Sequence, residues 1–341
     1  MTRIVCFGEL MLRLGAPDRE RLLQSARLTA TFGGAEANVA VSLARLGNDA
    51  AVVTTLPDNA LGTAAIDQLR MHGVDVSGIN QTAGRIGLYF LTPGAVQTPS
   101  DVLYDRQGSA FASASPSSYP WAKLLKGADW LHISGITPAV GPKACQAALK
   151  AAEEAVARGV KVSFDGNFRS KLWALWDGKP AEVWNKLLSL ATVAFVNELD
   201  IGLALGETFD QPDLMIRRRF SARRAFDTFP RLQFIASTVR EMDGVDSCTL
   251  TGLLYTRDHD AASGPRRLRN FVDRIGGGDA FAAGVLNGLI SGMDAHAAID
   301  FGLAASVLKH AVPGDYNPST VADVNALIAS WRGSGGLDVR R

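Results

Sequence analysis

Short apolar segments alternate with helix-like segments along most of the 341 residues. This alternation favours a mostly parallel β-sheet with helices on both faces, because each crossover between parallel strands is usually a helix. We therefore predict an α/β fold with a three-layer α/β/α core. The predicted strands cover residues 4–8, 51–55, 130–134, 160–165, 193–196 and 232–238, and the predicted helices cover residues 35–46, 60–72, 142–158, 180–190, 278–291, 295–310 and 320–332.

Two regions interrupt this alternation. Residues 10–32 and residues 86–110 each contain two extended segments that flank a polar loop. Both regions are typical of β-hairpins inserted between strand–helix units. A small antiparallel sheet made from the two hairpins would cover the edge of the main sheet as a lid. We expect residues 1–332 to form one domain, and residues 333–341, which are rich in glycine and charge, to be a flexible tail.

The composition argues against several classes of function. The chain is 47% hydrophobic and 20% charged, with a formal net charge of +1, so it lacks the basic surplus of a nucleic-acid-binding protein. The densest basic cluster, residues 217–219 with Arg223 and Arg224, is interpreted as a solvated helix face. No stretch reaches the roughly 18 apolar residues of a membrane helix, and three scattered cysteines predict reduced thiols. We expect a cytoplasmic protein with no membrane or nucleic-acid partner.

The C-terminal part carries the most specific motif. Residues 273–279 read Asp-Arg-Ile-Gly-Gly-Gly-Asp and lead into a helix-like segment. Gly276, Gly277 and Gly278 let the backbone approach a bulky anion, and the start of a helix adds unpaired N–H donors and the positive end of the dipole. This combination suits a phosphate in transit. Asp279 is placed to take a proton from a hydroxyl that attacks the phosphate, and the same residue can also cap the helix.

A second glycine motif lies at a predicted strand-to-helix junction near the N-terminus. Gly33 and Gly34 allow the close approach of a ligand. Asn38, one helical turn later, offers both a donor and an acceptor to a sugar hydroxyl. Taken alone, a tight turn that caps a helix is the more frequent structure. The pairing with the C-terminal motif favours a ligand site.

The two motifs, Gly-Gly-x-x-x-Asn at residues 33–38 and Asp-x-x-Gly-x-Gly-Asp at residues 273–279, resemble the signatures of ribokinase-like (PfkB) carbohydrate kinases. The resemblance extends over residues 1–332 and implies the ribokinase-like fold. Within the family, the chain looks most like the 2-keto-3-deoxygluconate (KDG) kinases. The segments that support this subgroup are residues 8–9, 87–90, 104–110, 132–137, 165–169, 307–310 and 313–315.

The subgroup resemblance implies a sugar-acid substrate, whose pocket must neutralise a carboxylate. Arginine is the usual partner of a carboxylate because its planar fork matches two oxygens. Arg106 lies on the predicted lid, and Arg169 follows the carboxyl end of a core strand, the edge at which open α/β sheets bind ligands. The resemblance places both arginines, with Tyr89 and Tyr104, on the substrate. A surface or capping arginine and ordinary hairpin packing are the competing interpretations.

The implied reaction is ATP-dependent phosphorylation of KDG to 2-keto-3-deoxy-6-phosphogluconate. Asp279 would take the proton of the primary hydroxyl, whose oxygen attacks the γ-phosphorus of ATP in line. N–H groups around the three glycines would hold the charge that develops on the phosphoryl oxygens. Mg²⁺ is expected to be carried mainly by the phosphates. Asn197 resembles the family's residues near the triphosphate, but an Asn-Glu pair is equally a good helix start.

The nucleotide contacts are less typical of the family. Arg274 replaces the usual small hydroxyl residue, which leaves a bound monovalent cation such as potassium as an open possibility, and Gly277 stands where most relatives carry alanine. The expected nucleotide strand ends without the usual lysine. Thr238 and Arg240 are therefore the candidates there for a phosphate contact, and the resemblance adds His310.

Other functions remain as alternatives. The first is a fructokinase or another sugar kinase of the same family, and a non-catalytic sugar-binding protein is a second, against which the presence of Asp279 counts. No Gly-x-Gly-x-x-Gly follows the first strand, which argues against a dinucleotide oxidoreductase, and no P-loop motif occurs. The exposed hairpin edges favour a homo-oligomer.

Overall fold

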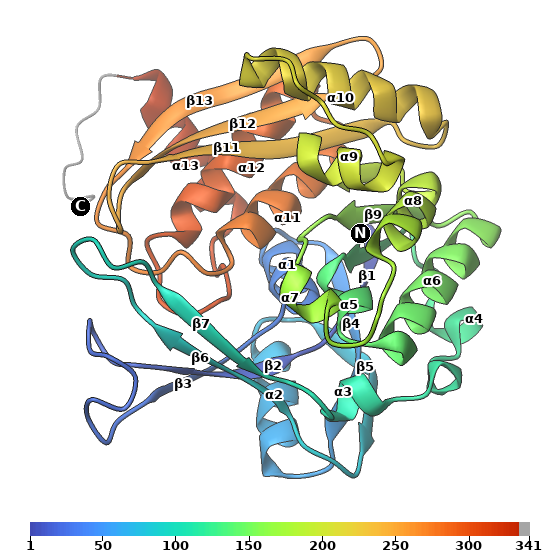
Figure 1. The fold of residues 1–341 in the computed structure, drawn as a ribbon, viewed down its shortest axis with the longest axis vertical. Helices are drawn as coiled ribbons and strands as arrows, with labels where there is room; N and C mark the ends of the chain where they lie inside the picture. Colours follow the sequence, from blue (N-terminus) through green and yellow to red (C-terminus); the bar gives the residue numbers. More distant parts are fainter. Residues whose placement is uncertain (334–341) are drawn as a thin grey trace.

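The computed structural model describes residues 1–333 and contains a nine-stranded sheet in the order β13-β12-β11-β10-β9-β8-β1-β4-β5 (Figure 1). All neighbouring strands from β11 to β5 pair in parallel, and only β11–β12 and β12–β13 are antiparallel. The strands are β1 (Arg3–Phe7), β4 (Asp49–Pro57), β5 (Asp75–Thr82), β8 (Trp130–Ser134), β9 (Lys161–Asp165), β10 (Val193–Phe195), β11 (Phe234–Met242), β12 (Cys248–Tyr255) and β13 (Asp260–Leu268).

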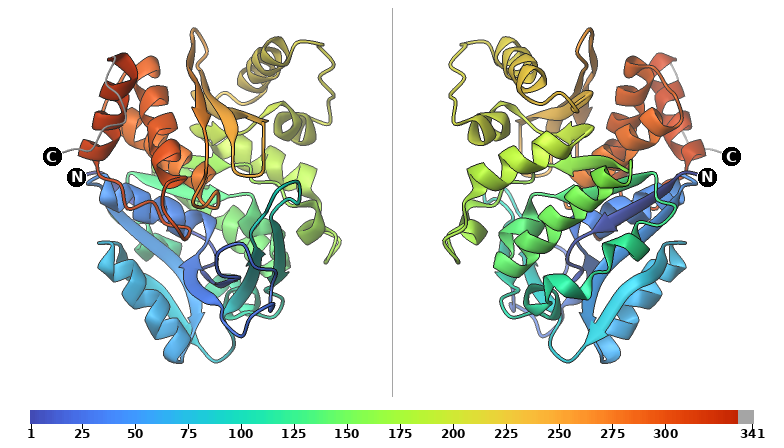
Figure 2. Two further views of the ribbon diagram at one scale, coloured as in Figure 1. Left: turned by 90° about the vertical axis from the view of Figure 1, so that its left-hand side faces the viewer. Right: turned by 90° about the vertical axis from the view of Figure 1, so that its right-hand side faces the viewer.

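Helices cover both faces of this sheet and complete the predicted three layers (Figures 1 and 2). One face carries α1 (Ala35–Arg45), α2 (Ala60–Met71), α11 (Gly277–Ile290) and α12 (Ala295–Lys309), with α13 (Val321–Arg332) packed on α12. The other face carries α3 (Ala110–Ser113), α4 (Trp121–Leu124), α5 (Ile136–Ala139), α6 (Pro142–Ala157), α7 (Ser170–Trp173), α8 (Pro180–Leu190), α9 (Glu198–Leu205) and α10 (Leu214–Thr228), and a 3₁₀ turn spans Pro116–Ser118.

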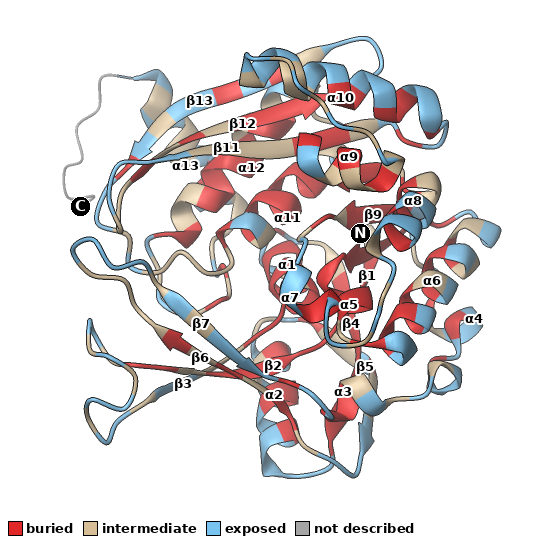
Figure 3. Cartoon of the chain, viewed as in Figure 1, coloured by how far each residue is buried: buried red, intermediate tan, exposed pale blue. Residues whose placement is uncertain are grey.

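The central strands are mostly apolar because both of their faces are buried. In β1, Ile4 and Cys6 join the core beneath α1 and α11, whereas Val5 and Phe7 join the core beneath α6. Alternate side chains of a strand point to opposite faces, so a strand covered on both sides is a nearly continuous apolar run. Figure 3 shows the resulting concentration of buried residues between the layers.

A separate four-stranded sheet forms the lid, in the order β3-β2-β6-β7 (Figures 1 and 2). Its strands are β2 (Met11–Gly15), β3 (Thr29–Gly33), β6 (Gly87–Thr92) and β7 (Asp101–Asp105). Both predicted hairpins are present and antiparallel, but the pairing of β2 with β6 that joins them is parallel. The lid is therefore not wholly antiparallel as predicted, because the two hairpins lie side by side with their inner strands in the same direction.

The strand register of the lid aligns four side chains on one face. Thr31 pairs with Arg13, Arg13 with Tyr89, and Tyr89 with Tyr104. Directly opposed residues on neighbouring strands share a face of the sheet. The lid thus presents a polar and aromatic row that crosses all of its strands.

All predicted strands and helices are present, with small differences at their ends. The sequence analysis missed β5, β12, β13, α9 and α10 as defined elements, together with the short helices α3, α4, α5 and α7. It was also wrong about Arg218, because this side chain is not solvated: its Nε donates to Glu198 Oε2 at 3.0 Å, and the helical period turns it towards α9. Part of the predicted tail, residues 334–341, lies outside the described residues. Among residues 1–333, no helix combines the length and apolar character that crossing a bilayer requires.

Candidate active site

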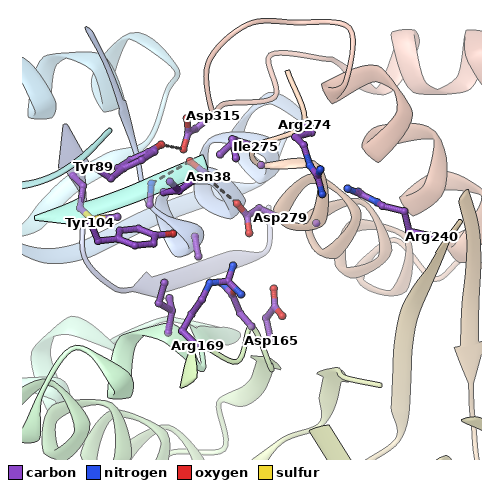
Figure 4. A pocket seen from close by; sticks show the side chains of 18 residues that line it. Asn38, Tyr89, Tyr104, Asp165, Arg169, Arg240, Arg274, Ile275, Asp279 and Asp315 are labelled. Atoms are coloured by element: carbon purple, nitrogen blue, oxygen red, sulfur yellow. Dashed lines mark hydrogen bonds between the residues drawn. The ribbon is translucent and has the colours of Figure 1, made fainter. Parts of the chain in front are cut away.

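A cavity of about 350 Å³ lies between the lid and the main sheet (Figure 4). It is bounded by the lid face, the carboxyl end of β9 and the amino ends of α1 and α11. The lining residues that bear on function are Met11, Gly34, Asn38, Tyr89, Tyr104, Asp165, Asn167, Arg169, Arg240, Arg274, Gly276, Gly278, Asp279 and Asp315. The two glycine motifs, which lie at opposite ends of the sequence, therefore meet at one cavity.

The glycine turn has the geometry of an anion site. Gly276 adopts φ 80°, precedes the first residue of α11 and leaves no room for a Cβ because the carbonyl of Asp315 occupies that space. Gly278 borders the cavity with no atom in the way of an approaching ligand. The first-turn N–H groups of a helix have no intrahelical partner and attract anions. The N–H of Gly277 is less available, since it donates to the carbonyl of Arg274 at 3.4 Å.

Asp279 and Asn38 are in direct contact, although they lie 241 residues apart in the sequence. Asn38 Nδ2 donates to Asp279 Oδ2 at 2.6 Å, and Asn38 Oδ1 accepts from the backbone N–H of Gly34 at 3.3 Å. The amide is thus fixed at both ends and holds the carboxylate of Asp279 in one orientation. In this structure Asn38 is a positioning residue for Asp279 as well as a lining residue of the cavity.

Several carboxylates raise one another's pKa around this contact. Burial raises the pKa of Asp279 to about 6, the Asn38 hydrogen bond opposes that rise, and the charge of Asp315 adds to it. Burial also raises the pKa of Asp165 well above its usual range, with contributions from Asp279 and Asp200. Burial raises the pKa of Glu36 to about 7, although Glu36 accepts hydrogen bonds from Thr137 and Ser134. Such shifts bring carboxylates into the range of general bases at neutral pH.

The two arginines assigned to a substrate carboxylate differ in their surroundings. Arg169 lines the cavity, donates to the carbonyl of Phe168 at 3.0 Å and has no ion-pair partner within the described part of the chain. Arg106 does not line the cavity: it is buried, and its Nε donates to Glu9 Oε2 at 2.7 Å. Its charge is therefore already neutralised by Glu9, so the structure supports Arg169 and not Arg106 as the free cation.

The two tyrosines also differ. Tyr104 reaches the cavity from the lid beside Tyr89, with ring centroids 6.0 Å apart (Figure 4). The hydroxyl of Tyr89 donates to Asp315 Oδ2, and the other oxygen of Asp315 accepts from Arg13 at 2.9 Å. Arg13 also contacts Asp273 at 2.7 Å. Tyr89 thus belongs to a buried network that joins the lid to the glycine turn.

Of the residues assigned to the nucleotide, only Arg240 and the glycines line the cavity. Asn197 caps α9 by accepting hydrogen bonds from Leu199 and Asp200, which is the helix-start alternative. The carbonyl of Thr238 accepts from Arg218. His310 lies behind the glycine turn, where its Cε1 is 2.6 Å from the position that a Cβ on Gly277 would take.

The sequence analysis did not assign five residues that the structure brings to the site. Asp165, Asn167 and Asp315 were noted only as parts of subgroup segments, and Arg274 only as a departure from the family pattern. Arg13 was not considered. A signal existed for Asp165 and Asn167, because polar residues directly after a buried strand of a parallel sheet lie at the ligand-binding edge. No local pattern marks Arg13, whose partners follow it by more than two hundred residues, Asp315 by 302.

Comparison with known proteins agrees with this architecture. The family model described as "pfkB family carbohydrate kinase" matches residues 1–228 and 243–322. A 2-dehydro-3-deoxygalactonokinase from Haloferax volcanii is 32% identical over 335 residues, which cover 98% of each chain.

Two solved structures superpose closely on the chain. A 2-dehydro-3-deoxygluconokinase from Thermotoga maritima has a TM-score of 0.90 and 36% identity, and a PfkB family carbohydrate kinase from Listeria grayi has a TM-score of 0.90 and 32% identity. Each comparison covers 96% of this chain and 100% of the other. The predicted ribokinase-like fold is confirmed, and the chain belongs to the PfkB family of carbohydrate kinases.

Proposed function

We propose that this sugar kinase transfers the γ-phosphoryl group of ATP to the primary hydroxyl of 2-keto-3-deoxygluconate. The observation that carries the proposal is the distribution of positive charge around Asp279. Arg169 lies on one side of this carboxylate, and Arg240 and Arg274 lie on another (Figure 4). A base between two cationic regions suits a reaction between two anions, a sugar acid and a nucleotide.

The names of the relatives support the same substrate class. The Thermotoga maritima structure is named a kinase of 2-dehydro-3-deoxygluconate, and the Haloferax volcanii protein a kinase of its galacto epimer. Both names denote keto-deoxy sugar acids. Fructose has no carboxylate to neutralise Arg169, so a fructokinase is the less favoured alternative.

In the proposed mechanism, Asp279 removes the proton of the attacking hydroxyl while Asn38 holds its carboxylate. The amide N–H groups of the first turn of α11 face the phosphoryl oxygens as charge develops there. ATP supplies the phosphoryl group, and Arg240, Arg274 and the amino end of α11 fit its phosphates by charge. Mg²⁺ prefers oxygen ligands, and the phosphates with water satisfy this preference, so no side chain is assigned to it.

The substrate assignment is tested by a coupled assay of ADP formation with KDG, its galacto epimer, fructose and ribose. Turnover with KDG above that with fructose and ribose supports the proposal. Turnover with the galacto epimer at a higher kcat/KM would keep the sugar-acid class but change the epimer. Activity with fructose and none with either sugar acid would establish the fructokinase alternative.

Replacing Arg169 by alanine is expected to raise KM for KDG roughly 10- to 150-fold, because a charged hydrogen-bond partner contributes about 1.5–3 kcal/mol. Steady-state kinetics over a range of KDG concentrations measures this change. Arg169→Lys keeps the charge without the planar fork and should give a smaller rise. A KM that stays the same in Arg169→Ala would show that another group binds the carboxylate.

The kcat/KM for KDG is expected to increase as the pH rises through about 6, because burial raises the pKa of Asp279 to about 6 and only the ionised carboxylate accepts a proton. Asn38→Ala removes a hydrogen bond that stabilises the carboxylate. The acid limb of the pH profile should therefore move to higher pH in this variant. Asn80→Ala, which removes an amide outside the cavity, is the matched control. Identical acid limbs in all three proteins would exclude the assigned Asn38–Asp279 coupling.

A further inference from the structure

Arg274 lies just before the glycine turn in the sequence, and its guanidinium side chain lines the cavity. This side chain makes no hydrogen bond or ion pair with any residue in the range 1–333. A second guanidinium, that of Arg240 on β11, reaches the same end of the cavity, and Arg274 lies between Asp279 and Arg240 in the view of Figure 4. The two cations come from segments on opposite sides of this end of the cavity.

This pair differs from two other arginines near the site, Arg13 and Arg218, which have acidic partners. Arg13 contacts Asp273 and Asp315, and Arg218 contacts Glu198. Neither Arg240 nor Arg274 has an acidic partner among residues 1–333: burial lowers the pKa of Arg240, and the charge of Arg274 lowers it further. Two partly buried like charges are unfavourable without a counter-charge. An anion with several negative oxygens, such as a nucleotide polyphosphate, would supply this counter-charge.

Arg240 is held in place by a neutral histidine. His310 Nδ1 lies 2.7 Å from the carbonyl of Ser306, so Nδ1 carries the proton and Nε2 is left as the acceptor for Arg240 Nη2 at 3.4 Å. Burial lowers the pKa of His310 to about 4, so the ring is neutral near pH 7. The missing Cβ of Gly277 gives this ring its space. Arg240 is therefore oriented by a protein partner, whereas the Arg274 guanidinium has none among the described residues.

We propose that Arg274 is a catalytic residue that binds the phosphoryl group in transit, whereas Arg240 binds the phosphates that remain on ADP. This assignment rests on the proposed kinase function. During transfer, the bond between the sugar oxygen and the γ-phosphorus forms, the bond from that phosphorus to the β–γ bridging oxygen breaks, and the hydroxyl proton goes to Asp279. Arg274, two residues before Gly276, neutralises the equatorial oxygens, a role that arginine fills in other phosphoryl transfers.

The test compares Arg274→Met and Arg240→Met in two measurements. Arg274→Met should lower kcat at least ~100-fold, by analogy with the loss of one transition-state donor, with little change in KM for KDG. Calorimetric titration without sugar should show weaker binding of a non-hydrolysable ATP analogue and unchanged binding of ADP. Arg240→Met should weaken the binding of both nucleotides. Arg267→Met, which removes an exposed arginine paired with Asp243, is the matched control.

Two outcomes would overturn this assignment. One is an Arg274→Met variant with a kcat within about threefold of the wild type, since a lost transition-state contact costs far more. The other is an equal loss of affinity for ADP and for the ATP analogue, which would place Arg274 on the non-transferred phosphates. The titrations need no sugar, so they test Arg274 even if the wild-type enzyme phosphorylates a sugar other than KDG, a result that would contradict only the proposed substrate.

Discussion

Replacing Asp279 by asparagine is expected to lower kcat about 10²- to 10⁴-fold, the usual contribution of a general base. Asparagine has nearly the same shape as aspartate but cannot take the proton of the attacking hydroxyl. The same change should not destabilise the fold. Burial and the charge of Asp315 both make the ionised carboxylate of Asp279 unfavourable. A neutral asparagine amide experiences neither of these penalties. Coupled kinetics and thermal unfolding measure the two effects.

A matched control variant and a measurement of KDG binding show whether the loss of kcat comes from the missing base at Asp279. Asp67→Asn makes the same chemical change on the exposed surface of α2 and should leave kcat unaltered. Asp279→Asn should still bind KDG, because Arg169, which we assign to the carboxylate of KDG, remains. Near-normal turnover in Asp279→Asn would rule out Asp279 as the base. Loss of KDG binding together with turnover would make it a substrate-binding residue instead.

Within the main sheet, the strands that the sequence predicted are strands covered by helices on both faces. Strands such as β10, covered by helices on both faces, are short apolar runs that the sequence pattern shows directly. The missed strands β5 and β13 form the two edges of the main sheet. An edge strand has one neighbour and partly exposed side chains, so polar residues are tolerated and the apolar pattern weakens. Their burial patterns contain exposed positions throughout.

The sequence predicted which residues of a single local motif reach the cavity. It did not predict the contacts between residues from distant segments. Asp279, the glycines and Arg169 follow from local chemistry at a helix start and a strand end. The ion pair of Arg106 with Glu9 could not be predicted from the sequence, because Glu9 lies 97 residues earlier and in a different part of the fold. The same holds for the Asn38–Asp279 hydrogen bond, which spans 241 residues. Each residue type was recognised, but its partner was set by the tertiary fold.

Replacing Arg13 by methionine is expected to lower the free energy of unfolding by about 3–5 kcal/mol, as when one partner of a buried ion pair is lost. Arg13 lies on lid strand β2 and contacts Asp273 and Asp315, and all three side chains are at most 10% exposed. Methionine fills a similar volume but leaves both carboxylates without their ion-pair partner, and the Lys309 charge nearby forms no direct ion pair with either of them. Chemical denaturation measures the loss. Arg19→Met breaks an exposed ion pair with Asp246 and should cost only about 0–1 kcal/mol.

The pH dependence of this loss separates charge from packing. Arg13 lowers the pKa of Asp315 in the folded state, so its removal raises that pKa further above the unfolded value. A carboxyl group with a raised folded pKa destabilises the fold when it ionises, and protonation removes that cost. The difference in stability between wild type and Arg13→Met should therefore be smaller at about pH 5 than at about pH 8. An equal difference at both pH values would mean that Arg13 stabilises the lid by packing alone, and that its carboxylate partners do not depend on its charge.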